Sequence, residues 1–568
     1  MKANAILTTA LLSAAMVSTI SAREKWPQMT DADKQRVAEW KQHEESLLKD
    51  LQPQLQEWAK KGKPFYANAI VPADLPQATV PAFPGAEGAG KFSFGGRGGK
   101  IFVVTSLEDS GPGTLREAVE SAGPRIVVFN VAGIIHLKMP LFIDAPYLTI
   151  AGQTAPGDGI CVAGESTLIN THDVVIRYMR FRRGNTSVFD RDDSLGGNPI
   201  GNIIVDHCSC SWGGDENLSM YRHITPASQG GTDQKLPTLN ITLQWNISSE
   251  ALNTYNHAFG GTWGGHNTSF HHNLFACNTG RNPSIGMTYD FNFVNNVLFN
   301  WRHRTVDGGD KGSLYNIINN YYKAGPAVNS GAIAYRILLP SATQKKPDMI
   351  PYFGKAYVAG NVVEGNEAVT KDNWDGGVQF ANGGSKDDPT TSPGRNRSLV
   401  DKVRANKPFP MAPVTITPAR EAYEQVLAGA GATLPHRDPV DARVIETVRT
   451  GKTLLMGKTI TPTPMKGLSR NDVGTAGNGI ITDVSQAGGY PEYKGEPAKD
   501  VGADGIPLWW KKKFKLDAKD ASLAQKDLQG DGYTVIEKYL DGLDPTKKID
   551  WKNPQSNMNT LTEEKLTK

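Results

Sequence analysis

The chain is 568 residues long, contains 59 Gly and 35 Pro, and is 39% hydrophobic. That length exceeds what one compact core usually holds, and the hydrophobic share excludes a disordered chain. The net charge at pH 7 is only +3, which gives no electrostatic argument for nucleic acid as a partner.

The first 22 residues predict a secretory signal peptide. Lys2 precedes an apolar stretch, and small residues stand before an expected cut after Ala22. A membrane anchor is the alternative, but Thr and Ser interrupt the apolar run, and no later run is apolar enough to span a bilayer. We therefore expect a secreted or periplasmic protein without stable membrane insertion.

Residues 23–78 predict a helical extension outside the main domain. Thr30 and Asp33 can cap a helix that runs to about Lys61. The apolar stripe of this helix consists of Val37, Trp40, Leu47, Leu48 and Leu51.

Residues 79–400 predict the main domain, an all-β solenoid that runs from about Lys100 to Val363. Six short stretches between 203 and 364 alternate apolar and polar residues as strands do. Five of them place an asparagine at the same point, at intervals of 27, 23, 24 and 41 residues: Asn246, Asn273, Asn296, Asn320 and Asn361. One β-rich unit every 20–50 residues is typical of a solenoid, since a single unit cannot bury its apolar face alone.

These repeats predict a right-handed parallel β-helix, in which the asparagine of each coil bonds the asparagine of the next. Upstream, Thr114 can cap a short amphipathic helix with Leu115, Ala118 and Val119 on one face. That helix would plug the open end of the core, because terminal repeats need a cap.

The four cysteines are expected to be buried core residues. Cys208 occupies the asparagine position of its coil, and the spacing of Cys208 and Cys210 is poor for a mutual disulfide. The four are Cys161, Cys208, Cys210 and Cys277, and a bridge between coils is the alternative.

Residues 401–568 predict a loop and helix region that packs on the β-helix, with helices at 419–432 and 438–452. The stretch from Asp527 through Asp531-Gly532 begins like an EF-hand loop, but its twelfth position is Lys538 instead of the bidentate glutamate. A structural turn is the favoured interpretation, and a weak Ca²⁺ site is the alternative.

Acidic residues gather on two successive coils, with Asp190, Asp192 and Asp193 on one and Asp215 on the next. Carboxylates on neighbouring strands repel unless they are protonated or bridged by a cation, and oxygen ligands of this kind suit Ca²⁺. Solvated turn acids are the alternative, because Asp is common in turns.

Basic residues supply the other candidates. Arg281 ends a predicted coil, where it can bind an anion or face water. His257 lies in a loop and is a candidate groove residue. The pair His271 and His272 is in-strand and is expected to point to opposite faces, which excludes a two-histidine metal site.

The order of the motifs resembles polysaccharide lyase family 1, the pectate lyases, in the form found among exported bacterial enzymes. The resemblance covers roughly residues 82–545, and the matching stretches include AFPGAEGAGKFSFGGRGG, DSGPGTLREAV, LTIAGQTAPGDGICV, IIVDHCSCSWGGDENLS and FGGTWGGHNTSFHHNLFACNTGRNP. It implies Ca²⁺-dependent β-elimination of polygalacturonate to 4,5-unsaturated oligogalacturonides. By position, Asp193 looks like a calcium carboxylate with Asp192 or Asp190 as its neighbour, Asp215 like the first carboxylate of the next coil, and Arg281 like the arginine that removes the proton.

The chain departs from the family pattern at several positions. A further family carboxylate falls on Ser219, and the second arginine of the R-x-P-x-x-R motif falls on Gly286. The lysine that grips a substrate carboxylate is not evident, and His257 and Arg304 are the candidates to replace it. Fewer positive groups are compatible with a methyl-esterified or branched pectin as the substrate, or with a degenerate catalyst.

We therefore expect a monomeric, secreted, calcium-dependent pectate lyase. Two alternatives stay open on the same fold. One is a galacturonan hydrolase that uses the acidic residues as its acid and base. The other is a non-catalytic pectin-binding protein.

Overall fold

The computed structural model describes residues 29–184, 192–225, 232–328, 330–341, 353–380, 392–393, 397–458 and 477–552. The predicted signal peptide and Asp190 lie outside these ranges. None of the helices in the described part of the chain is long and apolar enough to cross a membrane.

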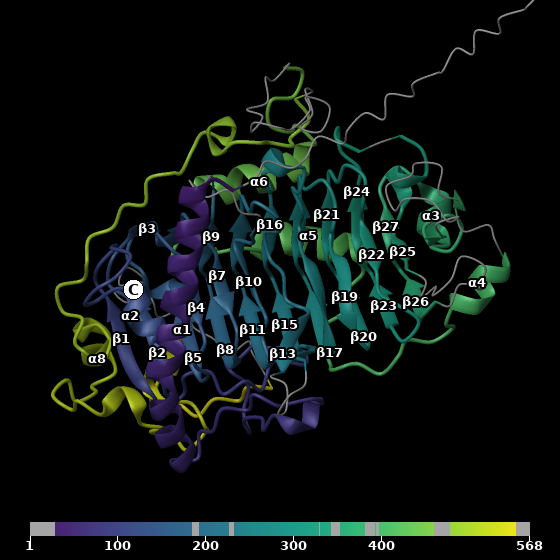
Figure 1. Cartoon of the computed structure of the whole chain (residues 1–568). Coiled ribbons are helices and arrows are strands. Elements are labelled where there is room, and N and C mark those ends of the chain that lie inside the picture. Colours follow the sequence, from purple (N-terminus) through teal and green to yellow (C-terminus); the bar gives the residue numbers. More distant parts are fainter. Residues whose placement is uncertain are drawn as a thin grey trace, which may run out of the picture.

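The described residues form a parallel β-solenoid, which confirms the predicted fold class (Figure 1). The longest sheet pairs equivalent strands of successive coils: β1 (Lys100–Val104), β2 (Arg125–Phe129), β5 (Leu148–Ala151), β8 (His172–Arg177), β11 (Gly201–Asp206), β15 (Leu239–Gln244), β17 (Thr262–His271), β20 (Asp290–Val294), β23 (Leu314–Ile318) and β26 (Lys355–Ala359). The second sheet consists of β3 (Gly133–His136), β6 (Ile160–Ala163), β9 (Arg180–Arg182), β12 (Ser209–Ser211), β16 (Ile247–Ser249), β18 (Leu274–Ala276), β21 (Val297–Phe299), β24 (Tyr321–Lys323) and β27 (Val362–Val363).

A third side of the solenoid is built from two shorter sets of parallel strands. The first set is β4 (Leu141–Ile143), β7 (Thr167–Ile169) and β10 (Leu195–Gly197). The second is β19 (Ser284–Thr288), β22 (Val306–Gly308) and β25 (Leu338–Pro340), and β19 pairs with the first half of β17. Among the named strands of the described chain, only two pairs are antiparallel: β13 (Arg222–Thr225) with β14 (Gln234–Pro237), and β28 (Gln379–Phe380) with β29 (Ser392–Pro393).

The predicted asparagine ladder is present in the core. The Asn246 side-chain amide donates to Oδ1 of Asn273 at 3.0 Å, and the same bond recurs from Asn273 to Asn296, from Asn296 to Asn320 and from Asn320 to Asn361. Each of these amides also donates to a backbone carbonyl, so the buried side chains are satisfied along the whole ladder. The backbone N–H of Cys208 donates to Asn246, as its place in the repeat predicts.

The N-terminal end of the core is closed by α2 (Leu115–Val119), as expected. The hydroxyl of Thr114 accepts from the backbone N–H of Glu117, which satisfies one free donor of the helix start. Leu115, Ala118 and Val119 are buried in the main core cluster. All four cysteines lie in the described ranges; they are buried and form no disulfide.

The longest helix, α1 (Asp31–Lys60), crosses the outside of the solenoid (Figure 1). Thr30 and Asp33 form the predicted capping box, and Trp40 and Leu51 are buried. Leu48 is 40% exposed, so its assignment to the buried stripe was wrong: the solenoid supports only part of this face.

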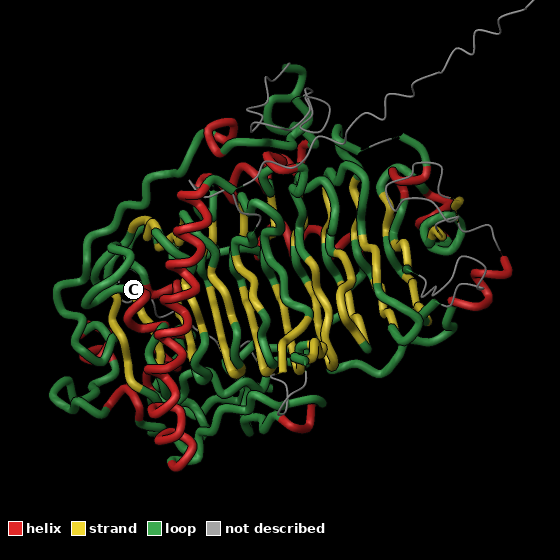
Figure 2. Tube along the Cα trace, viewed as in Figure 1, coloured by secondary structure: helices red, strands yellow, loops and turns green. Residues whose placement is uncertain are grey.

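The remaining helices are also peripheral (Figure 2). Next to the last coils lie α3 (Glu367–Lys371) and α4 (Arg397–Val403). The predicted helices α5 (Ala419–Gly429) and α6 (Pro439–Thr450) bury Val426, Leu427 and Val444 against residues of the second sheet. In the C-terminal segment, α8 (Leu508–Lys513) and α9 (Val535–Leu540) pack over β1 and β2 through Trp510, Ile536 and Leu540.

Candidate active site

The candidate site lies where equivalent positions of successive coils come into register. Leu195 bridges Leu218, and Glu216 bridges Phe259, which in turn bridges Gly280. Because parallel coils stack about 4.8 Å apart, side chains that leave the solenoid here form a row across the coils. This row contains the predicted acidic residues at one end and Arg281 at the other.

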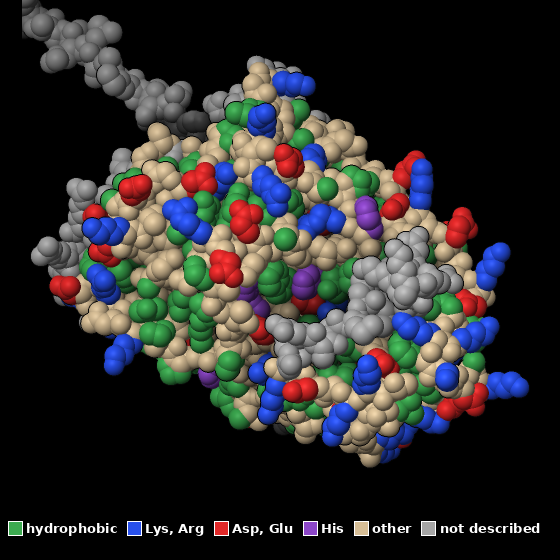
Figure 3. Space-filling model, turned by 180° about the vertical axis from the view of Figure 1, so that it is seen from behind, with side chains coloured by type: hydrophobic (Ala, Val, Ile, Leu, Met, Phe, Trp, Pro, Cys, Tyr) green, Lys and Arg blue, Asp and Glu red, His purple; other side chains and the backbone are tan. Residues whose placement is uncertain are grey.

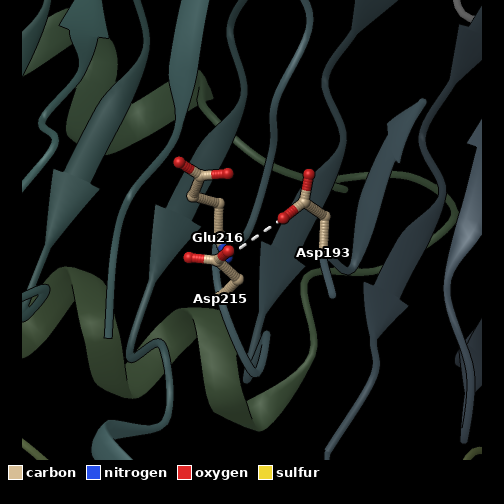
Figure 4. Close-up of side chains that lie close together, drawn as sticks. All are labelled: Asp193, Asp215 and Glu216. Atoms are coloured by element: carbon tan, nitrogen blue, oxygen red, sulfur yellow. Dashed lines mark hydrogen bonds between the residues drawn. The ribbon is translucent and has the colours of Figure 1, made fainter. Parts of the chain in front are cut away.

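Three carboxylates meet at the acidic end of the row (Figure 4). Asp193, Asp215 and Glu216 each offer one oxygen, and these oxygens lie within 4.8 Å of one another. The backbone N–H of Glu216 donates to Oδ1 of Asp193 at 3.1 Å, which holds the two coils together at this point. Thr262 donates its hydroxyl to Oε1 of Glu216 at 2.6 Å.

The three carboxylates repel one another. Burial, together with the charges of Glu216, Asp215 and Asp192, raises the pKa of Asp193 well above its usual range. Three clustered carboxylate oxygens are a donor set that suits Ca²⁺, and a bound cation would relieve the repulsion. The donor set therefore fits the predicted cofactor.

Asp192 is held apart from this group. Its carboxylate forms an ion pair with Nε of Arg183, which follows strand β9. The structure thus brings together two of the three predicted metal ligands, Asp193 and Asp215, and adds Glu216, which was not predicted.

Arg281 lies directly against the acidic cluster. Its guanidinium forms an ion pair with Glu216 and lies 3.8 Å from Oδ1 of Asp215. The guanidinium carbon also stacks 4.3 Å from the centre of the Phe259 ring. Burial works to lower the pKa of Arg281, but the charges of Glu216 and Asp215 outweigh it, so the net shift is upward.

Phe259 organises the basic side of the site, a role that the sequence did not reveal. The ring of His257 lies 4.7 Å from the ring of Phe259, and Nδ1 of His257 is 2.7 Å from Oδ1 of Asp215. Arg304 packs its guanidinium 4.8 Å from the same ring and pairs with Asp307 at 3.5 Å. The predicted groove residues His257 and Arg304 therefore flank Arg281 around one aromatic ring.

Two small residues, Gly280 and Ser219, lie beside these side chains. At Gly280, an added Cβ would lie 2.9 Å from Nε of Arg304, so any side chain there would displace the arginine. At the position of the missing family carboxylate, Ser219 is buried and its hydroxyl accepts from the backbone N–H of Thr262 at 2.9 Å. Ser219 thus supports the backbone and supplies no charge.

The expectation that His271 and His272 point to opposite faces was wrong. Their Nδ1 atoms are 3.0 Å apart, because His272 follows the end of β17 with a positive φ of 56° that turns the chain. Burial lowers the pKa of each of these imidazoles to about 3, so both are neutral at pH 7. They lie away from the acidic cluster, within a stack in which the ring of Trp245 is 4.3 Å from that of His272.

The C-terminal acidic stretch is a structural turn. Nζ of Lys538 lies 2.8 Å from Oδ2 of Asp531, and both side chains are buried. Asp527 accepts the backbone N–H of Gly532 at 2.8 Å, and Glu537 accepts the backbone N–H of Thr534 at 2.9 Å. The favoured interpretation of this stretch is therefore confirmed, with the lysine in the twelfth position as its internal cation.

The surface carries no extended charge of one sign on the face shown in Figure 3. Acidic and basic side chains are interspersed there, and a hollow near its middle holds histidine, acidic and hydrophobic side chains close together. This pattern agrees with the small net charge of the chain.

Comparisons with known proteins identify the family. No family model matches the chain. It is 33% identical over 473 residues to "Probable pectate lyase C" of Aspergillus fumigatus, and the match covers 82% of this chain and 94% of that protein. It is also 33% identical over 486 residues to the protein of the same name from Emericella nidulans, covering 84% and 96%. The chain therefore belongs to the pectate lyase family and is a polysaccharide lyase.

Two solved structures are matched by this chain over nearly their whole length. The major cedar pollen allergen jun a 1 shares 17% identity with a TM-score of 0.43 and covers 61% of this chain and 92% of that one. A pectate lyase from Bacillus sp. N165, solved in complex with trigalacturonate, shares 15% identity with a TM-score of 0.39, covering 61% and 98%. The two relatives described above are fungal, so the expectation of a bacterial type is not supported.

Proposed function

We propose that the chain is a secreted, calcium-dependent pectate lyase that cleaves polygalacturonate by β-elimination and releases 4,5-unsaturated oligogalacturonides. The observation that carries this proposal is the contact of Arg281 with the cluster of Asp193, Asp215 and Glu216. A basic side chain and a set of cation ligands within one small site are what proton abstraction next to a carboxylate requires.

The proposed ligands of the metal are Asp193, Asp215 and Glu216, with Asp192 one residue away. When bound, Ca²⁺ supplies positive charge that stabilises the anion formed at the substrate carboxylate and offsets the carboxylates that raise the pKa of Arg281. Two further groups hold the carboxylates through hydrogen bonds. Thr262 and the backbone of Glu216 fix the carboxylates in place before substrate binds.

Arg281 is the proposed base. In its neutral form, which a cation bound at the carboxylates would favour, it accepts the proton from C5 of a galacturonate and later returns that proton to solvent. The electron pair of the C–H bond forms the C4–C5 double bond, and the C4–O bond breaks. The leaving oxygen takes up a proton from solvent, so the reaction consumes no water across the cleaved bond. His257 and Arg304 lie on either side of Arg281 around Phe259, where they can bind substrate carboxylates and position C5.

The test is the ultraviolet absorbance of unsaturated uronide during incubation with polygalacturonate, with calcium and then with chelator. We expect a rise that chelator abolishes and that Arg281→Lys lowers by roughly 10²–10⁴-fold, the usual contribution of a positioned base. Arg420→Ala is the matched control, because Arg420 is exposed on α5 away from the site.

Other outcomes would support the alternatives. New reducing ends without absorbance would contradict the proposal in favour of a hydrolase. Binding of pectin without any product, unaffected by Arg281→Ala, would favour a non-catalytic binding protein.

A further inference from the structure

The C-terminal segment and the first coils border a cavity at a corner of the solenoid that the candidate active site does not use. The cavity has a volume of about 290 Å³. Gln153, which lines it, lies in the turn Gly152–Thr154 between β5 and β6, where the longest sheet passes into the second sheet. Asp193 lies between β9 and β10, where the second sheet passes into the third side. The cavity and the acidic cluster therefore occupy different corners.

One buried polar atom of this cavity lacks a hydrogen-bond partner. Gln153 is 4% exposed, and its side-chain amide donates to the backbone carbonyl of Leu540 at 3.3 Å. Its Oε1 is buried and accepts no hydrogen bond from the part of the chain that the structure describes. By contrast, Asn130 and Thr154 in the same lining are already bonded to backbone groups. Because a buried acceptor without a donor is unfavourable, the cavity suits a ligand that donates a hydrogen bond.

Much of the remaining lining is aromatic or aliphatic. Trp509 of α8 and Tyr539 of α9 supply two rings, and Leu434 supplies aliphatic surface. Trp509 is half-buried and Gly157 is exposed, so the cavity opens to solvent on their side, whereas Gln153 lies on its buried side. Apolar surface around a few placed polar atoms is the usual composition of a small-molecule site.

The charge of the lining selects the class of ligand. None of the described side chains that line this cavity is charged. A free carboxylate placed here would lose its water without gaining a counter-charge. A neutral sugar can pack the C–H groups of one ring face against Trp509 and donate a hydroxyl hydrogen to Gln153. The cavity therefore suits neutral sugars better than uronates.

A second cavity of about 290 Å³ lies at the same corner of later coils, and Leu434 lines both cavities. Rings from successive coils are stacked along it: the ring centre of His207 lies 4.9 Å from that of Tyr178 and 5.7 Å from that of Trp245. Arg177 in this lining is already paired with two carboxylates, so it adds no surplus positive charge. A ligand longer than one sugar can therefore extend from the first cavity into the second.

We infer that these two adjoining cavities form a second saccharide-binding site, for neutral sugars such as those in the side chains of a branched pectin. A polymer bound there would be held to the enzyme away from the position of cleavage. The choice of a saccharide rests on the family to which the chain belongs. The inference does not rest on the proposed reaction, because binding at this corner needs neither Arg281 nor the acidic cluster.

The test is isothermal titration calorimetry of the intact protein with β-1,4-galactotetraose, a neutral oligosaccharide. We expect the wild type to bind it and Trp509→Ala to weaken the binding about 10-fold or more, because the variant removes the half-buried ring. Gln153→Leu should weaken it about 3–10-fold, the usual effect of losing one hydrogen bond. Both variants should keep the wild-type kcat/KM on polygalacturonate.

Trp551→Ala is the matched control. It removes another half-buried tryptophan, which packs against Phe92 outside both cavities, and it should leave the affinity for galactotetraose unchanged. If thermal unfolding shows that Trp509→Ala does not fold, Trp509→Leu carries the test, because leucine keeps apolar volume without the aromatic face.

Three results would overturn the inference. The first is a wild type that does not bind galactotetraose, which would mean that the cavity holds only water. The second is binding that Trp509→Ala and Gln153→Leu leave unchanged, which would place the sugar elsewhere. The third is an equal loss of affinity for tetragalacturonate and galactotetraose in Trp509→Ala, which would contradict the preference for neutral sugars.

Discussion

The two acidic regions of the chain hold their carboxylates in opposite ways. In the C-terminal turn, Asp531 is paired with the buried ammonium of Lys538, and Asp527 accepts backbone N–H groups. In the candidate active site, Asp193, Asp215 and Glu216 lie within 4.8 Å of one another. The turn carries its own cation, whereas the candidate site combines more carboxylates than its neighbouring Arg281 neutralises. Acidic residues in a turn therefore do not by themselves identify a metal site, because a buried basic side chain beside them can neutralise their charge.

The largest effect is expected from removing the internal cation of the turn. Lys538→Met leaves Asp531 buried without its partner, which should cost about 3–5 kcal/mol of the free energy of unfolding. Thermal or denaturant unfolding measures it. Lys526→Met is the control, because the Lys526–Asp520 pair lies at the surface and should contribute little to stability.

Lys538→Glu would convert the turn toward a calcium loop. This variant supplies the carboxylate that the twelfth position of such a loop requires. We expect calcium to raise the melting temperature of Lys538→Glu and to leave that of Lys538→Met unchanged. An equal response of both variants to calcium would contradict the role given to Lys538.

A smaller effect is expected on calcium binding at the candidate active site. Asp215→Asn should weaken calcium binding by roughly 10–100-fold, because it removes one charged ligand and the partner of His257. Isothermal titration calorimetry with calcium alone measures this change. Asp527→Asn in the turn should leave the affinity unchanged, and a comparable loss there would show that the turn, too, binds the ion.

The smallest effect concerns pH. The pKa of Asp193 is raised in the folded protein, so its contribution to stability is full below about pH 4 and is lost as the pH rises through the raised value. The calcium-free protein should therefore lose stability over this range, and Asp193→Asn should lack that loss. Denaturant unfolding at a series of pH values checks it, and a wild type as insensitive to pH as the variant would contradict the repulsion.

The fold was predictable because its signal is repeated. Asn246, Asn273, Asn296 and Asn320 recur at one point of each coil, and each forms the bond that the pattern predicts. Asn373 was missed, although it accepts from the amide of Asn361 and ends the ladder. It follows Asn361 after 12 residues, in the loop after α3, so it lacks the strand pattern of the other members.

The sequence predicted only part of the candidate active site. Asp193 and Asp215 were identified from the motifs, but Glu216 was not, because the resemblance supplied only the first carboxylate of this coil. Residues 213–219 form a bend with isolated bridges instead of a strand, so Asp215 and Glu216 reach the same cluster. At the position of the missing second arginine, Gly286 packs so closely against the Tyr221 ring that an added Cβ would lie 2.5 Å from Cδ2 of the ring. This contact depends on the register of coils far apart in sequence, which no local pattern contains.

The asparagine ladder also allows the solenoid to be lengthened by whole coils. Asn296 and Asn320 are separated by 24 residues, and both the backbone N–H and the side-chain amide of Asn296 donate to Oδ1 of Asn320. One coil is therefore a repeat unit with a matching rung at each end. A tandem duplication of that segment would insert another rung and lengthen the solenoid by about 4.8 Å without changing the pairing on either side. Chain length along this axis is therefore a variable that evolution or engineering can adjust in whole coils to match a longer polymer.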